Sequence, residues 1–269
     1  MNIEDLRFVI TGSGKGIGAE TARVAAAAGA KVMLSDVDHD AGEATAAEIR
    51  DAGGDAHYTP CDVSDETQVE QLMAATADAF GGIDVLHNNA GTHESMIGNE
   101  VTLDTMSRRT FEKILQINLV GPFLCAKHAV PHLRKSEKAS IINAGSTASF
   151  LGFPQNLAYG ASKGGVATLT KNLAVELAPD GIRVNAYCPA GVETEMVTRF
   201  VDASPNPEIL RKAVVNTHLV PRIGAPRDVA NLVCFLASPE ASFINGVTWL
   251  IDGGSLCWRS TVDVLGMGQ

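Results

Sequence analysis

Short apolar runs and longer alanine-rich stretches alternate along the chain. The runs are rich in β-branched residues and predict seven strands, at 7–11, 31–36, 56–62, 83–90, 139–145, 182–189 and 247–252. The stretches between them have helical patterns, and those at 17–29 and 65–81 each end in glycine, the usual C-terminal stop of a helix. Strand and helix alternating at this spacing predict a parallel sheet that is covered by helices on both faces.

This alternation contains no linker, internal repeat or low-complexity segment. We therefore expect a single α/β domain over residues 1–269, built on a doubly wound parallel seven-stranded sheet, the Rossmann fold. Within it, residues 190–220 are expected to form a substrate loop, and residues 255–269 a C-terminal tail.

The composition narrows the classes of function. A net charge of -10 argues against nucleic acid as the main partner, because a protein that binds a duplex needs a basic surface. No apolar run reaches the roughly 18 residues that suggest a membrane span, and the first residues show no signal-peptide pattern. The five cysteines form no C-x-x-C pair, which suits a reducing compartment. A soluble cytoplasmic protein is the expectation.

The histidines do not predict a metal site. His128 and His132 are four residues apart, which suits zinc, but Pro131 interrupts the helical pattern and no third ligand is nearby. His93 is of more interest, because it follows the strand predicted at 83–90, where open α/β sheets place their ligands. It is either a substrate contact or an ordinary loop residue.

A glycine-rich loop, "TGSGKGIG", occupies residues 11–18, between a predicted strand and a predicted helix. A Walker A loop with its lysine at this point would need glycine at position 9 and Ser or Thr at position 16, where this chain has Val9 and Gly16. The spacing of Gly12, Gly16 and Gly18 instead suits a tight turn that lets a pyrophosphate approach the backbone and the helix N-terminus. Such a turn can also be purely structural.

Two charged residues bear on the identity of a dinucleotide. Asp36 ends the second predicted strand, eighteen residues after Gly18, where a carboxylate can accept hydrogen bonds from the adenosine ribose and would repel a 2′-phosphate. Lys15 points weakly toward NADP, since a cation in the loop could bind that phosphate. A carboxylate at the ribose conflicts with the phosphate directly, whereas a loop lysine can simply face solvent. NAD is therefore favoured over NADP.

Tyr159 and Lys163 are four residues apart in "YGASK", so they share one face of a predicted helix. The pKa of a free tyrosine is about 10, too high for proton exchange at neutral pH. A nearby ammonium group favours the phenolate and lowers that pKa, so the pair could interconvert an alcohol and a ketone. The same spacing also occurs on ordinary exposed helix faces.

Together these motifs resemble the short-chain dehydrogenase/reductase family over about residues 5–254. The matching features are "TGSGKGIG" at 11–18, "NNAG" at 88–91, Asn118, Ser146, the Tyr159–Lys163 pair, "CPAGVETEM" at 188–196 and the segment from Arg222 to Gly254. They occur in the family's order and at its spacings. One departure is Pro189-Ala190, where the family often has Pro-Gly.

The resemblance implies four catalytic residues. Tyr159 would exchange a proton with the substrate oxygen, and Ser146 would orient that oxygen through a hydrogen bond. Lys163 would bind the nicotinamide ribose and lower the pKa of Tyr159. Asn118 would hold a water molecule in a proton relay from Lys163 to solvent. The nicotinamide carries the hydride itself.

The resemblance also implies a set of binding residues. The cofactor set is Gly12, Ser13, Lys15, Gly16, Ile17, Gly18, Asp36, Val37, Asp62, Val63, Asn89, Ala90, Gly91, Tyr159, Lys163, Pro189, Val192 and Thr194. His93, Ser146, Phe153 and Met196 are candidate substrate contacts, although core packing explains apolar residues of this kind equally well.

The sequence therefore predicts an NAD-dependent oxidoreductase that acts on a secondary alcohol or ketone. One alternative is an NADP-dependent 3-oxoacyl-thioester reductase, which would share the fold and the four catalytic residues. A less favoured alternative is a dinucleotide-binding redox sensor without catalysis. The resemblance implies a small-molecule substrate and a homotetramer or homodimer, and no nucleic acid or membrane partner is expected.

Overall fold

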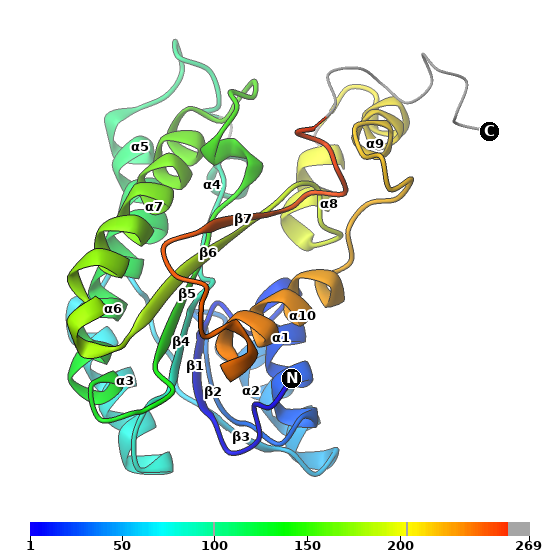
Figure 1. Ribbon diagram of the computed structural model, residues 1–269. Coiled ribbons are helices and arrows are strands. Elements are labelled where there is room, and N and C mark those ends of the chain that lie inside the picture. The colour runs from blue at the N-terminus through cyan, green and yellow to red at the C-terminus, as the bar shows by residue number, and fades with distance from the viewer. Residues whose placement is uncertain (99, 203, 258–269) are drawn as a thin grey trace.

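The computed structural model describes residues 1–98, 100–202 and 204–257. Its centre is a seven-stranded parallel sheet in the order β3-β2-β1-β4-β5-β6-β7 (Figure 1). The strands are β1 (Arg7–Thr11), β2 (Lys31–Ser35), β3 (Asp55–Tyr58), β4 (Val85–Asn88), β5 (Ser140–Ala144), β6 (Arg183–Pro189) and β7 (Thr248–Ile251). The strand order reverses between β1 and β4, which opens a crevice at the carboxyl ends of these two strands.

Helices cover both faces of the sheet. They are α1 (Gly16–Ala27), α2 (His39–Asp51), α3 (Glu66–Phe80), α4 (Glu94–Ile97), α5 (Arg108–Leu115), α6 (Gly121–Leu133), α7 (Leu157–Glu176), α8 (Glu195–Asp202), α9 (Pro207–Asn216) and α10 (Pro226–Ala237). In Figure 1, α1, α2 and α10 lie on one side of the sheet, and α3, α6 and α7 lie on the other. A π-helical turn, Gln116–Val120, joins α5 to α6.

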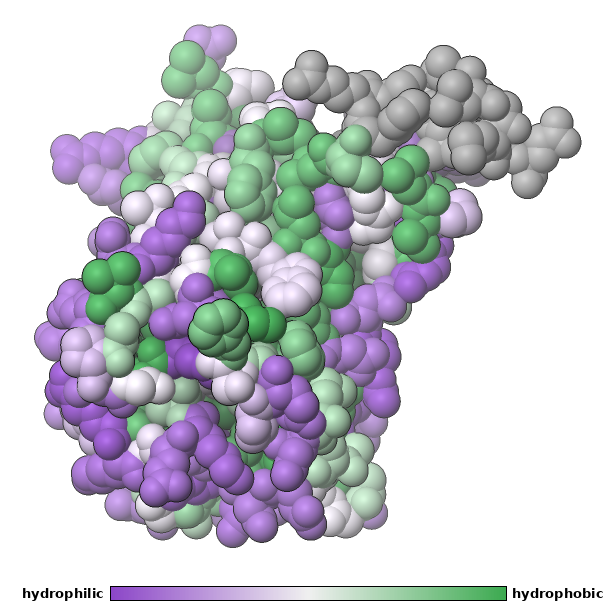
Figure 2. Space-filling model, viewed as in Figure 1, coloured by the Kyte–Doolittle hydropathy of each residue, from purple (hydrophilic) through white to green (hydrophobic). Residues whose placement is uncertain are grey.

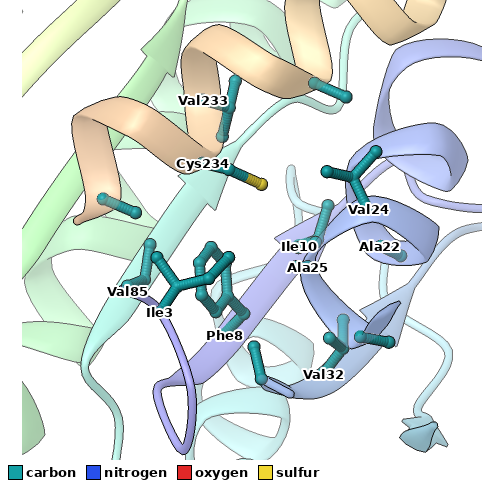
Figure 3. Packing of buried hydrophobic residues seen from close by; sticks show 14 of the residues in the cluster. Ile3, Phe8, Ile10, Ala22, Val24, Ala25, Val32, Val85, Val233 and Cys234 are labelled. Atoms are coloured by element: carbon teal, nitrogen blue, oxygen red, sulfur yellow. The ribbon is translucent and has the colours of Figure 1, made fainter. Parts of the chain in front are cut away.

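The alternation of side chains along the strands produces two separate hydrophobic cores. On β1, Phe8 and Ile10 join the core under α1 and α10, whereas Val9 between them joins the core under α3 and α6. Figure 3 shows the first of these cores, in which Val233 of α10 faces the β1 side chains. Because successive strand residues point to opposite faces, a strand buried on both sides is apolar at nearly every position.

The predicted fold is confirmed, with differences at the ends of elements. The third strand was expected over 56–62 but ends at Tyr58, since the chain beyond it leaves the sheet toward the crevice. The expected substrate loop, 190–220, is largely helical and contains α8 and α9. Most of the predicted tail, residues 258–269, lies outside the described residues.

Neither a membrane-spanning helix nor a metal centre is present among the residues that the structure describes. None of their helices combines the length and apolar character needed to cross a membrane. No group of three or more His, Cys, Asp or Glu side chains in this part of the chain is arranged to hold a metal ion. His128 places Nε2 3.0 Å from Oε1 of Glu66 on α3.

Candidate active site

The glycine loop connects the end of β1 to the start of α1, and its glycines are required by close contacts. Gly12 has a φ of +63°, and a Cβ there would lie 2.7 Å from Cα of Ala90. Gly16 has a φ of +60°, in the left-handed region that favours glycine. A Cβ on Gly18 would collide with the carbonyl oxygen of Gly12. The loop therefore passes very close to the backbone that follows β4 and leaves the first N–H groups of α1 facing the crevice.

Asn89 braces this loop from the end of β4. Its Nδ2 donates to the carbonyl oxygens of Gly12 (2.7 Å) and Thr11 (3.1 Å). The hydroxyl of Thr11 in return accepts from the backbone N–H groups of Asn89 (3.2 Å) and Ala90 (3.1 Å). These four hydrogen bonds hold the two segments at a fixed separation.

Two buried residues that the sequence did not single out extend this network. The Tyr187 hydroxyl donates to Oδ1 of Asn89 (3.1 Å) and lies 3.1 Å from Nε2 of His87. Burial lowers the pKa of His87 to about 3, so its imidazole is neutral. The sequence offers no distinct signal for the pair, because the same two strands carry other polar residues, among them Asn88 and Asn185.

Asp36 and Lys15 occupy different positions at the mouth of the crevice. Asp36 accepts the backbone N–H of Gly14 at Oδ2 (2.8 Å) and that of Asp38 at Oδ1 (2.9 Å). Lys15 donates from Nζ to Oδ2 of Asp38 (2.9 Å), and this contact lowers the pKa of Asp38. Glu195 lies 3.9 Å from the same ammonium group. The charge of Lys15 is therefore matched by carboxylates of the protein itself.

A groove of about 660 Å³ runs from these residues to the catalytic candidates. Most of the predicted cofactor set lines it: Gly12, Lys15, Gly16, Ile17, Asp36, Val37, Asp62, Val63, Asn89, Ala90, Gly91, Tyr159, Lys163, Pro189 and Thr194. Met196 also lines the groove, as do Thr92, Met96 and Ile97. Ser13, Gly18 and Val192 are not among its lining residues; all three are buried behind its wall, and Val192 accepts from the Thr194 hydroxyl (3.2 Å). Phe153 is 44% exposed and lies outside the groove lining.

Lys163 and Tyr159 are held together on the first two turns of α7. Lys163 is 4% exposed, donates from Nζ to the carbonyl oxygen of Ala144 (2.8 Å) and lies 5.5 Å from the centre of the Tyr159 ring. Burial lowers the pKa of Lys163 to about 8. Burial also raises the pKa of Tyr159, while a hydrogen bond with the Ser146 side chain acts in the lowering direction. Burial is the largest influence, so the pKa of Tyr159 is raised, opposite to the expected lowering by Lys163.

Ser146 follows β5 and faces the same tyrosine. Its hydroxyl oxygen accepts the backbone N–H of Ala148 (3.1 Å), which fixes the side chain at the start of a short 3-10 turn. Ser146 is 7% exposed, so it and Lys163 are buried beside Tyr159, which is itself partly exposed where it lines the groove. Electrostatic interactions are stronger in such a site than in water.

Asn118 lies in the π-helical turn, a distortion that is frequent at functional sites. Its Oδ1 accepts the backbone N–H of Thr92 (2.8 Å), and its Nδ2 donates to the Thr92 carbonyl oxygen (2.9 Å) and the Ser162 hydroxyl (3.1 Å). A Cβ on Gly91 would lie 3.4 Å from Oδ1 of Asn118 and 3.6 Å from Nζ of Lys163. Asn118 and Lys163 therefore approach Gly91 from two sides.

His93 lies against Tyr159 but outside the lining of the groove. Its ring packs edge-on against Tyr159, with ring centres 5.1 Å apart, and against Phe200 at 5.9 Å. Nδ1 accepts the backbone N–H of Ser95 (3.1 Å), and Nε2 lies 3.2 Å from Oδ1 of Asn156. Both ring nitrogens therefore already have protein partners.

Comparison with known proteins agrees with this geometry. A model of the protein family described as "Enoyl-(Acyl carrier protein) reductase" matches residues 12–255. Cis-4-hydroxycyclohexanecarboxylate dehydrogenase of Sinomonas cyclohexanicum is 37% identical over 246 residues, which cover 91% of this chain and 94% of the relative. A 2,5-dichloro-2,5-cyclohexadiene-1,4-diol dehydrogenase of Sphingobium indicum is 35% identical over 248 residues, 92% and 95% of the two chains. The crystal structure of levodione reductase superimposes with a TM-score of 0.89 at 34% identity, covering 95% of this chain and 99% of the other.

Proposed function

Because this chain belongs to the short-chain dehydrogenase/reductase family, whose similar members act on alcohols and ketones, we propose that it transfers hydride between NAD and a secondary alcohol or ketone. The observation that carries the proposal is that Tyr159 and Lys163 line one end of the dinucleotide-sized groove, with Ser146 hydrogen-bonded to Tyr159 and Asn118 beside Gly91. A non-catalytic sensor would need the groove but not this cluster.

The residues of the groove fit a nicotinamide dinucleotide. The approach of Gly12 to Ala90 leaves no room for a side chain, so backbone N–H groups at the start of α1 can reach a pyrophosphate. Lys163 lies at the far end, within reach of a ribose hydroxyl. When bound, the nicotinamide supplies or accepts the hydride.

The protein's own residues would handle the proton and the substrate oxygen. Tyr159 exchanges the proton through its hydroxyl, and Ser146 holds the substrate oxygen beside that hydroxyl. Lys163 places a positive charge near the phenol, and Asn118 fixes the backbone at Thr92 between this cluster and solvent. The burial of Ser146 and Lys163 shields one side of the proton exchange from bulk water.

NAD is the proposed cofactor in preference to NADP. The carboxylates of Asp36 and Asp38 lie together at the mouth of the groove, joined by the hydrogen bond from the Asp38 N–H to Asp36. A 2′-phosphate at this point would meet both carboxylates. Lys15, the cation that could have offset them, is already paired with Asp38.

A hydroxylated or oxidised six-membered ring is the proposed substrate class. Two relatives are named for substrates that contain a cyclohexane or cyclohexadiene ring. In this chain Met96, Ile97 and Met196 line the groove and supply an apolar wall for such a ring. A screen of substituted cyclohexanols against acyclic secondary alcohols, read as NADH absorbance, tests this class; faster turnover of an acyclic panel member would contradict it.

We also place this enzyme in the cytoplasm as a homotetramer. Apolar side chains of β7 and its neighbourhood are exposed, including Phe243, Trp249 (40%) and Leu250 (40%). Figure 2 shows apolar residues gathered over β7, above a mainly hydrophilic lower part of the molecule. Burial of this face against another copy would remove it from water. Light scattering should give four times the 28.2 kDa chain mass, and a monomer would contradict the proposal.

The decisive test of the reaction is Tyr159→Phe, which removes only the hydroxyl. We expect turnover to fall by about 100-fold or more, because the proton-exchanging group is lost. NADH affinity, measured by its fluorescence on binding, should stay within about threefold, since no other groove contact changes. Near-full turnover in the variant would contradict the proposal, and unaltered binding without activity in the wild type would favour a sensor.

A further inference from the structure

Glu94 is a buried carboxylate at the start of the helix that carries the catalytic candidates. It is 1% exposed and follows His93 as the first residue of α4. Its Oε1 accepts the backbone N–H groups of Ala158 (2.8 Å) and Tyr159 itself (3.0 Å). The first N–H groups of a helix have no partner within that helix. The N-cap residue Asn156 makes no capping hydrogen bond, so Glu94 supplies this cap from another element.

The second oxygen of Glu94 is directed toward His93. Within the described chain, Oε2 is buried without a hydrogen-bond partner, and it lies 3.4 Å from Nε2 of His93. Because Nδ1 of His93 accepts the Ser95 N–H, the proton of the neutral ring lies on Nε2 and faces both Glu94 and Asn156. His93 therefore contacts the second oxygen of Glu94 without a hydrogen bond to it.

The negative charge of Glu94 raises the pKa of Tyr159. A carboxylate near a phenol raises the phenol's pKa, and Glu94 contributes to the raised pKa of Tyr159 in addition to burial. The other titratable groups facing this tyrosine are His93, Lys163, Cys188 and Tyr187. Burial keeps His93, Cys188 and Tyr187 neutral, since it lowers the pKa of the first and raises those of the other two. Glu94 and Lys163 therefore carry opposite charges near the same tyrosine, Tyr159.

We propose that Glu94 is a positioning residue for Tyr159, which caps the first turn of α7 through two N–H groups and, by its buried negative charge beside that turn, opposes ionisation of the Tyr159 hydroxyl. This inference rests on the proposed role of Tyr159 in proton exchange. A protonated Tyr159 is the form that can donate to a ketone oxygen, and alcohol oxidation then requires a higher pH.

Glu94→Gln tests the charge separately from the cap. The glutamine carbonyl oxygen can still accept both N–H groups, but the negative charge is gone. We expect the alkaline rise of kcat for alcohol oxidation to move measurably to lower pH. Glu94→Ala removes the cap as well, and it should lower both turnover and the thermal unfolding midpoint, whereas Glu94→Gln should keep most of that midpoint.

A second readout needs no substrate and no activity. Tyrosinate absorbance during a pH titration, taken as the difference between a protein and its Tyr159→Phe version, isolates Tyr159. The remaining tyrosines ionise late, because burial raises the pKa of Tyr58 to about 12 and also raises that of Tyr187. We expect Tyr159 to ionise above the ordinary value of about 10 in the wild type and at lower pH in Glu94→Gln.

Glu100→Gln is the matched control. Glu100 also accepts a backbone N–H before a helix, that of Ser107 ahead of α5 (3.1 Å), but it lies outside the groove lining. Its substitution should leave both pH profiles unchanged.

Three outcomes decide the matter. A Tyr159 titration in Glu94→Gln that coincides with the wild type would overturn the proposal. Phenolate formation near neutral pH in the cofactor-free wild type would overturn it too, even if the variant fails to fold. A shifted titration in a protein that oxidises no alcohol would support the charge effect while contradicting the proposed function.

Discussion

The Asp36 carboxylate is held by two backbone N–H groups, those of Gly14 and Asp38. These contacts fix a negative charge beside the glycine loop, independently of any side-chain partner. Lys15 is in a different situation, because it is more than half exposed and its ammonium group lies on Asp38. At the residue scale, we therefore expect Asp36, and not Lys15, to determine the preference for NAD over NADP.

Asp36→Asn should weaken discrimination against NADPH. The amide oxygen can still accept the Gly14 N–H, but the charge that repels a 2′-phosphate is removed. We expect the ratio of kcat/KM for NADH over NADPH to fall by about tenfold or more, equivalent to about 1.4 kcal/mol. Asp40→Asn, an exposed change in the first turn of α2, is the control. An unchanged ratio in Asp36→Asn would contradict the assignment.

At the scale of elements, the start of α1 depends on the absence of a side chain. Gly18 lies where the helix, the glycine loop and Asn89 meet, and a Cβ would be 2.6 Å from Nδ2 of Asn89 as well as against the Gly12 carbonyl. Gly164, in α7, has no atom within 4 Å of a Cβ. Close packing therefore excludes a side chain at Gly18 in α1, whereas there is space for one at Gly164 in α7.

Alanine at these two positions should change stability in opposite directions. Gly18→Ala should lower the free energy of unfolding by about 1–3 kcal/mol, because the loop must move to admit the methyl group. Gly164→Ala should raise it by about 0.5–1 kcal/mol, because alanine loses less conformational entropy in a helix. Urea unfolding at neutral pH, with light scattering to check assembly, measures both. A Gly18→Ala protein as stable as the wild type would show that the loop is not tightly packed.

At the scale of the whole molecule, the buried neutral His87 makes stability depend on pH. Burial lowers the pKa of His87 from 6.5 to about 3. Between these values the unfolded chain binds a proton that the folded protein does not. The contribution of His87 is therefore fully present above pH 6.5 and is lost as the pH falls toward 3.

His87→Gln should flatten this acid dependence. Between pH 7 and pH 5 the wild type loses about 2 kcal/mol of its free energy of unfolding, because the unfolded chain protonates His87. Gln cannot take up that proton, so the variant should not show this loss. Urea unfolding of both proteins at the two pH values gives the difference. His57→Gln is the control, since His57 is half-exposed on β3. Equal losses in the wild type and His87→Gln would contradict the prediction.

Much of the fold could be predicted because its signals are local. The central positions of β1 and β2 are apolar, since both faces of these inner strands are buried, and Gly12 and Gly18 mark contacts that exclude a side chain. The predicted end positions of the helices and strands were less accurate. The substrate loop expected over 190–220 holds two helices, α8 and α9, whose short polar patterns are weak signals in sequence.

The sequence by itself determined the parallel α/β architecture, the glycine loop and the Tyr159–Lys163 pair, because their spacing along one chain carries that information, while the resemblance to a family added Ser146 and Asn118. Only the tertiary structure decided that Glu94 caps the helix of Tyr159 from sixty-five positions away, and that burial raises the pKa of this tyrosine. The physical reason is that desolvation and hydrogen bonds between distant segments depend on packing in three dimensions. A lone buried carboxylate has no periodicity by which a sequence could reveal its partner.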